Sequence, residues 1–153
     1  MLPATSLELI DQVVPNPDGF YPDLNLQDWQ ELYRVPGDAP QSLERLLLLA
    51  MQDSNRHLAS WKAELLADAV AAGDPVPTEL PATYRTDYEE GVYAQATALL
   101  IPLLPSIVTD ERAREEMALL HQTPGHYHDR SEARLGRITG TALGRGRIKA
   151  AVI

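Results

Sequence analysis

The sequence predicts an all-α protein, a small bundle of three to five helices with an extended N-terminal arm and an extended C-terminal tail able to form a strand. Apolar residues recur at spacings of three and four over residues 41–72 and 83–100, which is the pattern of helices with one buried face. Proline-rich segments before and between these stretches fit neither a helix interior nor a paired central strand. We therefore expect an arm at residues 1–24, a helical domain at 25–143 and a tail at 144–153.

The arm places two aromatic residues, Phe20 and Tyr21, among Pro15, Pro17 and Pro22. Because proline fixes φ and has no amide donor, this segment must follow an extended or turning path and lie on another surface. That surface is either the chain's own two tryptophans or a neighbouring subunit.

A short helix and a long central helix follow the arm. Asn25 is placed to cap the short helix, since its side chain can accept a hydrogen bond from a first-turn amide. The stripe of this helix is expected to contain Leu26, Trp29, Leu32 and Tyr33. The central helix is expected to run from Gln41 to Ala72 and to end at Gly73. Trp61 continues its apolar stripe, so we expect Trp61 in the core.

Further helices complete the predicted bundle. One spans about residues 83–100, carries small residues that let another helix approach, and is bent or ended by Pro102 and Pro105. Another is expected near residues 109–121. After a loop of sequence TPGHYHDR, the last helix is expected to begin with Ser131 as its cap. Its apolar face is formed by Leu135, Ile138 and Ala142.

Composition excludes several classes of function. The chain has 153 residues, 44% of them hydrophobic, and no cysteine, which rules out thiol catalysis and cysteine-based zinc sites. A net charge of −9 argues against nucleic-acid binding over the whole surface, although residues 134–153 hold five bases and no acid. No stretch has the length and hydrophobicity of a membrane span or a signal peptide. We expect a soluble, single-domain protein made in the cytoplasm.

Neither an enzyme site nor a cofactor site is recognised. The adjacent acidic pairs, Glu89–Glu90 and Glu115–Glu116, point in directions about 100° apart on a helix, so we interpret them as solvated faces. A phosphate-binding loop and a nucleophile elbow are both absent from the sequence. The candidate metal ligands lack the helical His-x-x-x-His spacing, and we interpret them as surface residues on a loop. They are His121, His126, His128 and Asp129.

Four stretches, in this order, resemble the head completion (head stabilisation) proteins of temperate contractile-tailed phages, the GPL family. An Asp-Gly-Phe-Tyr-Pro-Asp arm, a helix with Ser-Asn-Arg-x-Leu-x-x-Trp and a Gly-Arg-x-Arg tail form a fairly specific combination over most of the chain. Pro102 and Pro105 depart from the family, in which this helix more often continues. The stretches are DGFYPDLNLQDWQELYRV (Asp18 to Val35), LLLLAMQDSNRHLASWKAE (Leu46 to Glu64), YEEGVYAQATALL (Tyr88 to Leu100) and the terminal LGRGRIKAAVI.

The resemblance implies a non-enzymatic component of the virion neck, which joins the capsid vertex after DNA packaging and keeps the genome inside. Its partners would be further copies of itself in a ring of twelve, the portal protein, other neck or tail-completion proteins, and packaged DNA that passes without sequence-specific binding; no membrane is involved. Phe20 and Tyr21 would contact a neighbouring subunit. The tail would dock on the portal or an adjacent ring through Arg145, Arg147, Ile148, Lys149 and Val152.

Two alternatives from other classes stay open at this point. A small helical DNA-binding regulator would use the basic C-terminal region on phosphates, although Gly136, Gly140, Gly144 and Gly146 each disfavour a recognition helix by up to about 1 kcal/mol relative to alanine. A metallo-hydrolase would use the histidines and would contain stoichiometric metal. A salt-dependent gel shift would favour the regulator, and ring assembly with a portal would favour the connector.

Overall fold

The computed structural model describes residues 8–104 and 124–140. The described residues form five α-helices and one two-stranded sheet, which confirms the predicted all-α class. In chain order the elements are β1 (Val13–Val14), β2 (Leu24–Asn25), α1 (Leu26–Tyr33), α2 (Pro40–His57), α3 (Ala59–Ala72), the 3-10 turn η2 (Ala82–Tyr84), α4 (Arg85–Leu100), the 3-10 turn η3 (Ile101–Leu103) and α7 (Pro124–Thr139).

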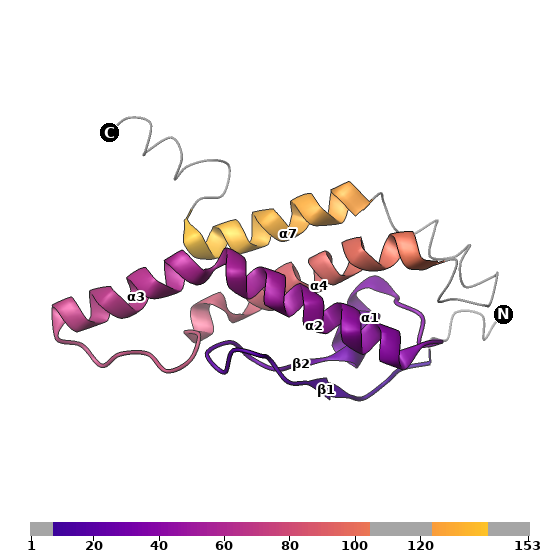
Figure 1. Cartoon of the computed structure of the whole chain (residues 1–153), viewed down its shortest axis with the longest axis horizontal. Coiled ribbons are helices and arrows are strands. Elements are labelled where there is room, and N and C mark those ends of the chain that lie inside the picture. Colours follow the sequence, from indigo (N-terminus) through magenta and orange to yellow (C-terminus); the bar gives the residue numbers. More distant parts are fainter. Residues whose placement is uncertain (1–7, 105–123, 141–153) are drawn as a thin grey trace.

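Helix α4 lies at the centre of the bundle, with α2 on one side and α7 on another (Figure 1). The hairpin of β1 and β2, together with α1, covers a further side of α2 and α4. Helix α3 continues from α2 and projects beyond the other helices at one end. The bundle therefore has a packed body and one protruding helix.

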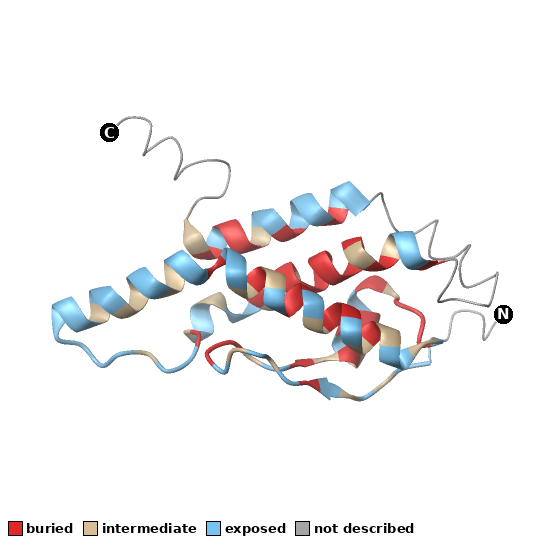
Figure 2. Cartoon of the chain, viewed as in Figure 1, coloured by how far each residue is buried: buried red, intermediate tan, exposed pale blue. Residues whose placement is uncertain are grey.

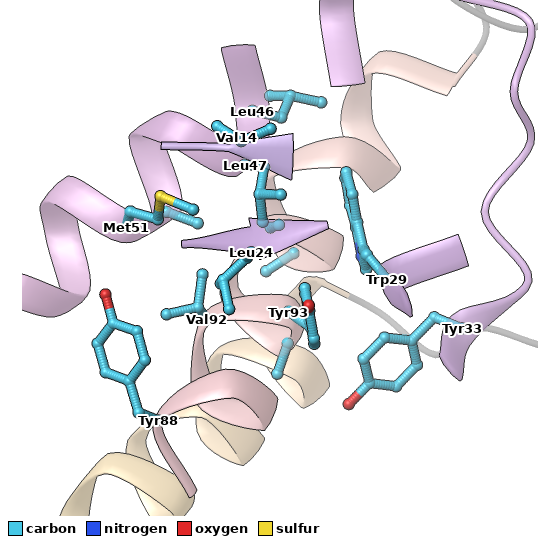
Figure 3. Close-up of a cluster of buried hydrophobic side chains, with 14 of the residues drawn as sticks. Val14, Leu24, Trp29, Tyr33, Leu46, Leu47, Met51, Tyr88, Val92 and Tyr93 are labelled. Carbon is cyan, nitrogen blue, oxygen red and sulfur yellow. The ribbon is translucent and has the colours of Figure 1, made fainter. Parts of the chain in front are cut away.

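The core is built around α4 because this helix is apolar or small on almost all of its faces. Ten of its sixteen residues are buried, including Tyr88, Val92 and the run from Tyr93 to Ala98. A helix that is buried all round belongs to the centre of a fold rather than to its surface. Side chains from the hairpin, α1 and α2 converge on it, among them Leu24, Trp29 and Leu47 (Figure 3).

The predicted central helix is interrupted at Leu58, so the expectation of one helix from Gln41 to Ala72 was wrong. Leu58 adopts φ −93° and ψ 2°, and α3 begins with the next residue. Neither glycine nor proline marks this bend. It occurs where the buried stripe ends: Leu58 is fully buried, whereas α3 contains no buried residue. Trp61 is accordingly half-buried rather than part of the core. Figure 2 shows only exposed and half-buried residues along α3.

The last helix begins seven residues earlier than expected. The segment predicted as a loop is the first half of α7, which starts at Pro124, a residue type that suits the first helical position because its missing amide has no partner there. Ser131 is therefore an internal, buried residue and not a cap. Leu135 and Ile138 are buried, as predicted.

The remaining local predictions are mixed. Asn25 caps α1, accepting a hydrogen bond from the Gln27 amide, and Gly73 ends α3 with φ 75°, both as expected. Leu32 is 44% exposed and does not join the buried stripe of α1. Helix α4 ends at Leu100, and Pro102 lies in η3. The helix expected near residues 109–121 and the C-terminal tail lie outside the described residues.

Candidate functional site: the locked arm and the projecting helix

The N-terminal arm is a hairpin that packs on the helices. Val13 pairs with Asn25 and Val14 with Leu24, in an antiparallel ladder two residues long. The prolines between the strands supply no amide donors and keep the ladder short. Val14 and Leu24 are almost fully buried, so the arm belongs to the same hydrophobic core as the helical domain.

Phe20 and Tyr21 are buried against their own chain, with exposed fractions of 6% and 3%. The Tyr21 ring stacks on Tyr88 of α4, with centroids 4.8 Å apart and planes 7° from parallel. The ammonium of Lys62 lies 4.8 Å from the centroid of the Phe20 ring. Within the single chain, the surface that receives these rings is therefore formed by Tyr88 and Lys62. A subunit contact through them stays a prediction, limited to the small area left accessible.

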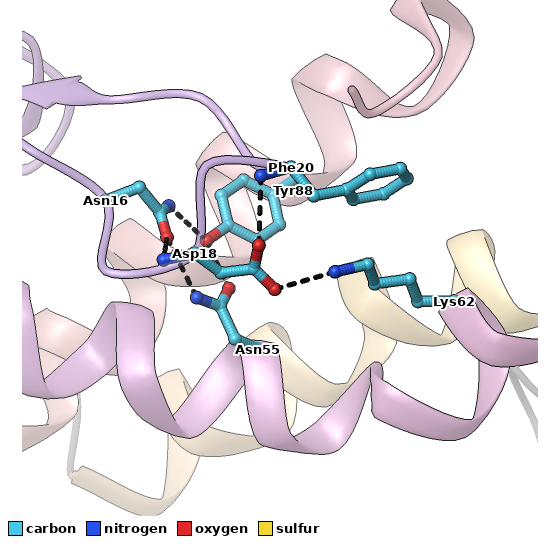
Figure 4. A network of polar contacts seen from close by, with 6 residues as sticks. All are labelled: Asn16, Asp18, Phe20, Asn55, Lys62 and Tyr88. Carbon is cyan, nitrogen blue, oxygen red and sulfur yellow. Dashed lines mark hydrogen bonds and ion pairs between the residues drawn. The ribbon is translucent and has the colours of Figure 1, made fainter. Parts of the chain in front are cut away.

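A closed triangle of hydrogen bonds fastens the arm to two helices (Figure 4). Asn16 Nδ2 donates to Tyr88 Oη at 2.8 Å, Tyr88 Oη donates to Asn55 Oδ1 at 2.6 Å, and Asn55 Nδ2 donates to Asn16 Oδ1 at 2.8 Å. Each of these polar groups is satisfied by the other two. Burial raises the pKa of Tyr88, so its hydroxyl keeps the proton that the triangle needs.

Asp18 joins the arm to the first turns of α3. Its Oδ1 accepts a hydrogen bond from the Phe20 amide at 2.9 Å, and its Oδ2 lies 2.9 Å from Lys62 Nζ. Burial raises the pKa of the Asp18 carboxyl, but the Phe20 amide and the Lys62 ammonium outweigh this and lower the pKa below its ordinary value. The charged form is thus favoured in the fold, and Lys62 is engaged within the chain.

Replacing Tyr88 by phenylalanine is expected to destabilise the protein by about 1–3 kcal/mol, because Asn16 and Asn55 each lose a partner in a half-buried site. The matched control is Tyr21→Phe. The Tyr21 hydroxyl is buried without a hydrogen-bond partner in the described part of the chain, so its removal should leave stability unchanged or slightly higher. Urea denaturation measures both; equal losses would show that the triangle is not what holds the arm.

Ion pairs fasten α7 to α4. Arg134 binds both Asp87 and Glu90, and Arg137 lies 3.3 Å from Asp87. Glu90 is therefore not on a purely solvated face, and its neighbour Glu89 pairs with Arg85 on the same helix. Two of the five bases in residues 134–153 are thus neutralised by α4, which weakens the hypothesis that this region contacts DNA phosphates.

Two of the candidate metal ligands, His126 and His128, are exposed residues of α7. His126 packs edge-on against the Tyr127 ring. His128 Nδ1 lies 3.1 Å from Gln95 Oε1, and its Nε2 lies 3.4 Å from Glu132. In residues 8–104 and 124–140, no group of three or more histidine or acidic side chains converges as a metal site would require. His121 lies outside those residues.

Helix α3 is the part of the described chain that offers most unused surface. Each other helix has buried residues, whereas all fourteen residues of α3 are exposed or half-buried. Its contacts with the body are made in its first half, where Trp61 meets the Tyr84 ring edge-on at 5.2 Å and where Leu65 and Leu66 pack against the core. Val70, near its end, is 66% exposed. A helix that leaves much of its apolar surface exposed is typical of a protein–protein contact surface.

The comparison with protein families decides the class of this protein. A family model described as phage head completion protein (GPL) matches residues 16–146. The chain belongs to this family. The match begins at Asn16 of the polar triangle and includes α1 to α4 and α7, so the whole bundle is characteristic of a head completion protein. Neither a curated protein nor a solved structure matches the chain.

Family membership confirms the resemblance recognised in the sequence and assigns a head completion role in the phage virion. A structural component of the phage head is also consistent with the expectation of a non-enzymatic protein. Among the described residues, no helix has the length and apolar character needed to cross a membrane. The tail residues expected to dock on a partner, from Arg145 to Val152, lie outside the described part of this head completion protein.

Proposed function

We propose that this head completion protein assembles as a ring of twelve copies on the portal after DNA packaging. The ring stabilises the filled head, retains the genome and forms the adaptor on which the neck is built. The observation that carries the proposal is the family match over residues 16–146. The acidic character of the chain supports it, since a net charge of −9 discourages adhesion to the DNA that passes through the channel.

The fold offers the kind of surface that a ring needs. Subunits of a ring meet through two different faces, and each copy uses one face for each neighbour. The body of the bundle is locked internally by the polar triangle and by the ion pairs of α7, whereas α3 extends from it with no buried residue (Figure 1). A rigid body with one protruding helix suits assembly by contact with an identical copy.

The tail is proposed as the main attachment to the portal or to an adjacent ring. In an extended chain, Arg145, Arg147 and Lys149 lie on one face because successive side chains alternate. Ile148 and Val152 would lie on the other face and fill apolar pockets, either as an added strand or as an inserted peptide.

Deleting residues 144–153 is expected to abolish incorporation into the neck and to let packaged DNA leak, while the helical fold is retained. The assay adds the purified full-length or truncated protein to DNA-filled, portal-bearing heads that lack it. Bound copies and nuclease-resistant DNA are then measured. Circular dichroism of the truncated protein provides the control for folding. Normal retention of DNA by the truncated protein would contradict attachment through the tail, and failure of the full-length protein to bind the heads would contradict the proposed function.

A further inference from the structure

The exposed side of α3 carries negative charge next to small residues. Five residues along this side are exposed, at spacings of one, three and four: Ala63, Glu64, Ala67, Asp68 and Ala71. From residue 63 to residue 84 the chain holds four acids, all exposed, and no base. The two cations that flank this stretch in the sequence, Lys62 and Arg85, are paired with Asp18 and Glu89 respectively. A partner for this surface should therefore be a helix with a large apolar side chain and a free positive charge.

The outer face of α2 has those properties. Arg45, Leu49, Gln52 and Arg56 are exposed and lie on one side of the helix, at spacings of four, three and four. Leu49 is 44% exposed, although the preceding Leu46 and Leu47 are buried. Arg56 pairs with Asp53, whereas Arg45 forms no ion pair with any residue in the described part of the chain. Arg45 and Leu49 thus combine a free cation with an exposed apolar side chain.

One copy of the chain cannot bring these two surfaces together. Leu49 and Ala67 each lie nine residues from the bend at Leu58, on opposite sides of it. At about 1.5 Å per residue, each lies roughly 14 Å from the bend along its own helix axis. Because α2 and α3 extend from the bend toward opposite ends of the molecule (Figure 1), their complementary surfaces lie toward different ends as well.

We propose that α3 of one copy docks on the outer face of α2 of the next copy. Leu49 packs between the alanines of α3, whose small side chains allow the two helices to approach, and Arg45 pairs with Asp68 or Glu64. The contact rests on the proposed ring and names its subunit interface. It joins two different faces, so the growing assembly has a free α3 at one end and a free α2 at the other until the ring closes.

Charge reversal tests the pairing on portal-bearing heads. Arg45→Glu or Asp68→Arg alone should reduce the number of bound copies about tenfold or more, because like charges would then face each other. An equimolar mixture of the two variants should restore binding. In a ring in which the variants alternate, Asp68 of one variant meets Arg45 of the other, and the introduced arginine meets the introduced glutamate. Glu132→Arg, at an exposed position on α7, is the control with the same change of charge and should bind normally. Normal binding by both single variants would overturn the interface.

Disulfide cross-linking tests the geometry directly, because the chain contains no native cysteine. The double variant Leu49→Cys/Ala67→Cys, oxidised on the heads, should give a ladder of covalent multimers, since disulfides require Cα atoms within about 7 Å. Each single variant should stay monomeric. If the double variant binds the heads but stays monomeric after oxidation, the proposed α2–α3 contact is wrong, whereas the proposed ring assembly is not contradicted. If the wild-type protein does not bind the heads, the proposed function fails and the interface fails with it.

Discussion

Replacement of Trp29 by alanine is expected to destabilise the protein by about 3–5 kcal/mol, the cost of truncating a large aromatic side chain in a packed core. Trp29 is fully buried between α1 and α4 (Figure 3). Its Nε1 donates a hydrogen bond to Thr97 Oγ1 at 2.9 Å, so the substitution also removes a buried polar contact. For a chain of this size, the loss corresponds to a melting temperature lower by roughly 6–20 °C. Thermal denaturation followed by circular dichroism measures it.

The matched control is Trp61→Ala, the same truncation on the projecting helix. Trp61 is half-buried and contacts the Tyr84 ring edge-on, so we expect a loss of about 1–2 kcal/mol. From the sequence alone, Trp61 was the tryptophan assigned to the core. If Trp61→Ala proves as damaging as Trp29→Ala, α3 packs more tightly on the body than the structure indicates.

The helical bundle could be predicted because its main helices carry a clear periodicity. In α2, Leu43, Leu47, Ala50 and Ser54 recur at spacings of three and four, and all four are buried. Helix α4 was predicted within two residues at its start, since small and apolar residues fill it between the prolines of the preceding linker and Pro102. Periodicity reports which face of a helix is apolar, and in α2 a partner covers that face. Helix α4 is buried on most of its faces, so its spacing indicated a helix but not how far the helix is buried.

Periodicity does not report whether a partner exists within the chain, and α3 shows this limit. Its Trp61 and Leu65 continue the spacing of α2 but are only half-buried. After the bend at Leu58, α3 projects from the bundle, and Figure 2 shows only exposed and half-buried residues along it. The same ambiguity applied to the aromatic pair of the arm. Phe20 and Tyr21 suit a subunit interface as well as an intramolecular core, and only the position of Tyr88 decides between the two for the single chain.

The polar contacts of the arm could not be predicted because they join distant parts of the sequence. Asn16 is 39 residues from Asn55 and 72 residues from Tyr88. Asn55 and Tyr88 lie in stretches that resemble the family, but nothing in those stretches indicates that the two side chains meet each other or Asn16. The start of α7 was missed for a different reason. Pro124 and Gly125 were interpreted as a break, although proline is also a preferred first residue of a helix.

Gly91→Val is expected to destabilise the protein by about 3 kcal/mol through the contact between α4 and α7. A Cβ at this position would lie 2.8 Å from Leu135 Cδ2 and 3.0 Å from Leu135 Cγ, and Leu135 is itself buried. The Gly91 carbonyl also accepts a hydrogen bond of 2.7 Å from Ser131 Oγ, which a displaced α7 would lose. Because Arg134 and Arg137 follow the same helix, its ion pairs with α4 would weaken as well.

The cause of this loss can be isolated by a second change across the same contact. Leu135→Ala alone should cost about 2–4 kcal/mol by leaving a cavity, but in the Gly91→Val background it removes the atoms that the new side chain meets. The double variant should therefore lose at least about 1 kcal/mol less than the sum of the single losses, as coupled neighbours do. Gly19→Val is the control, because a Cβ there meets no heavy atom within 4 Å and should change stability little. Strictly additive losses in urea denaturation would mean that valine at position 91 acts through α4 alone and that the close approach of α7 does not require glycine.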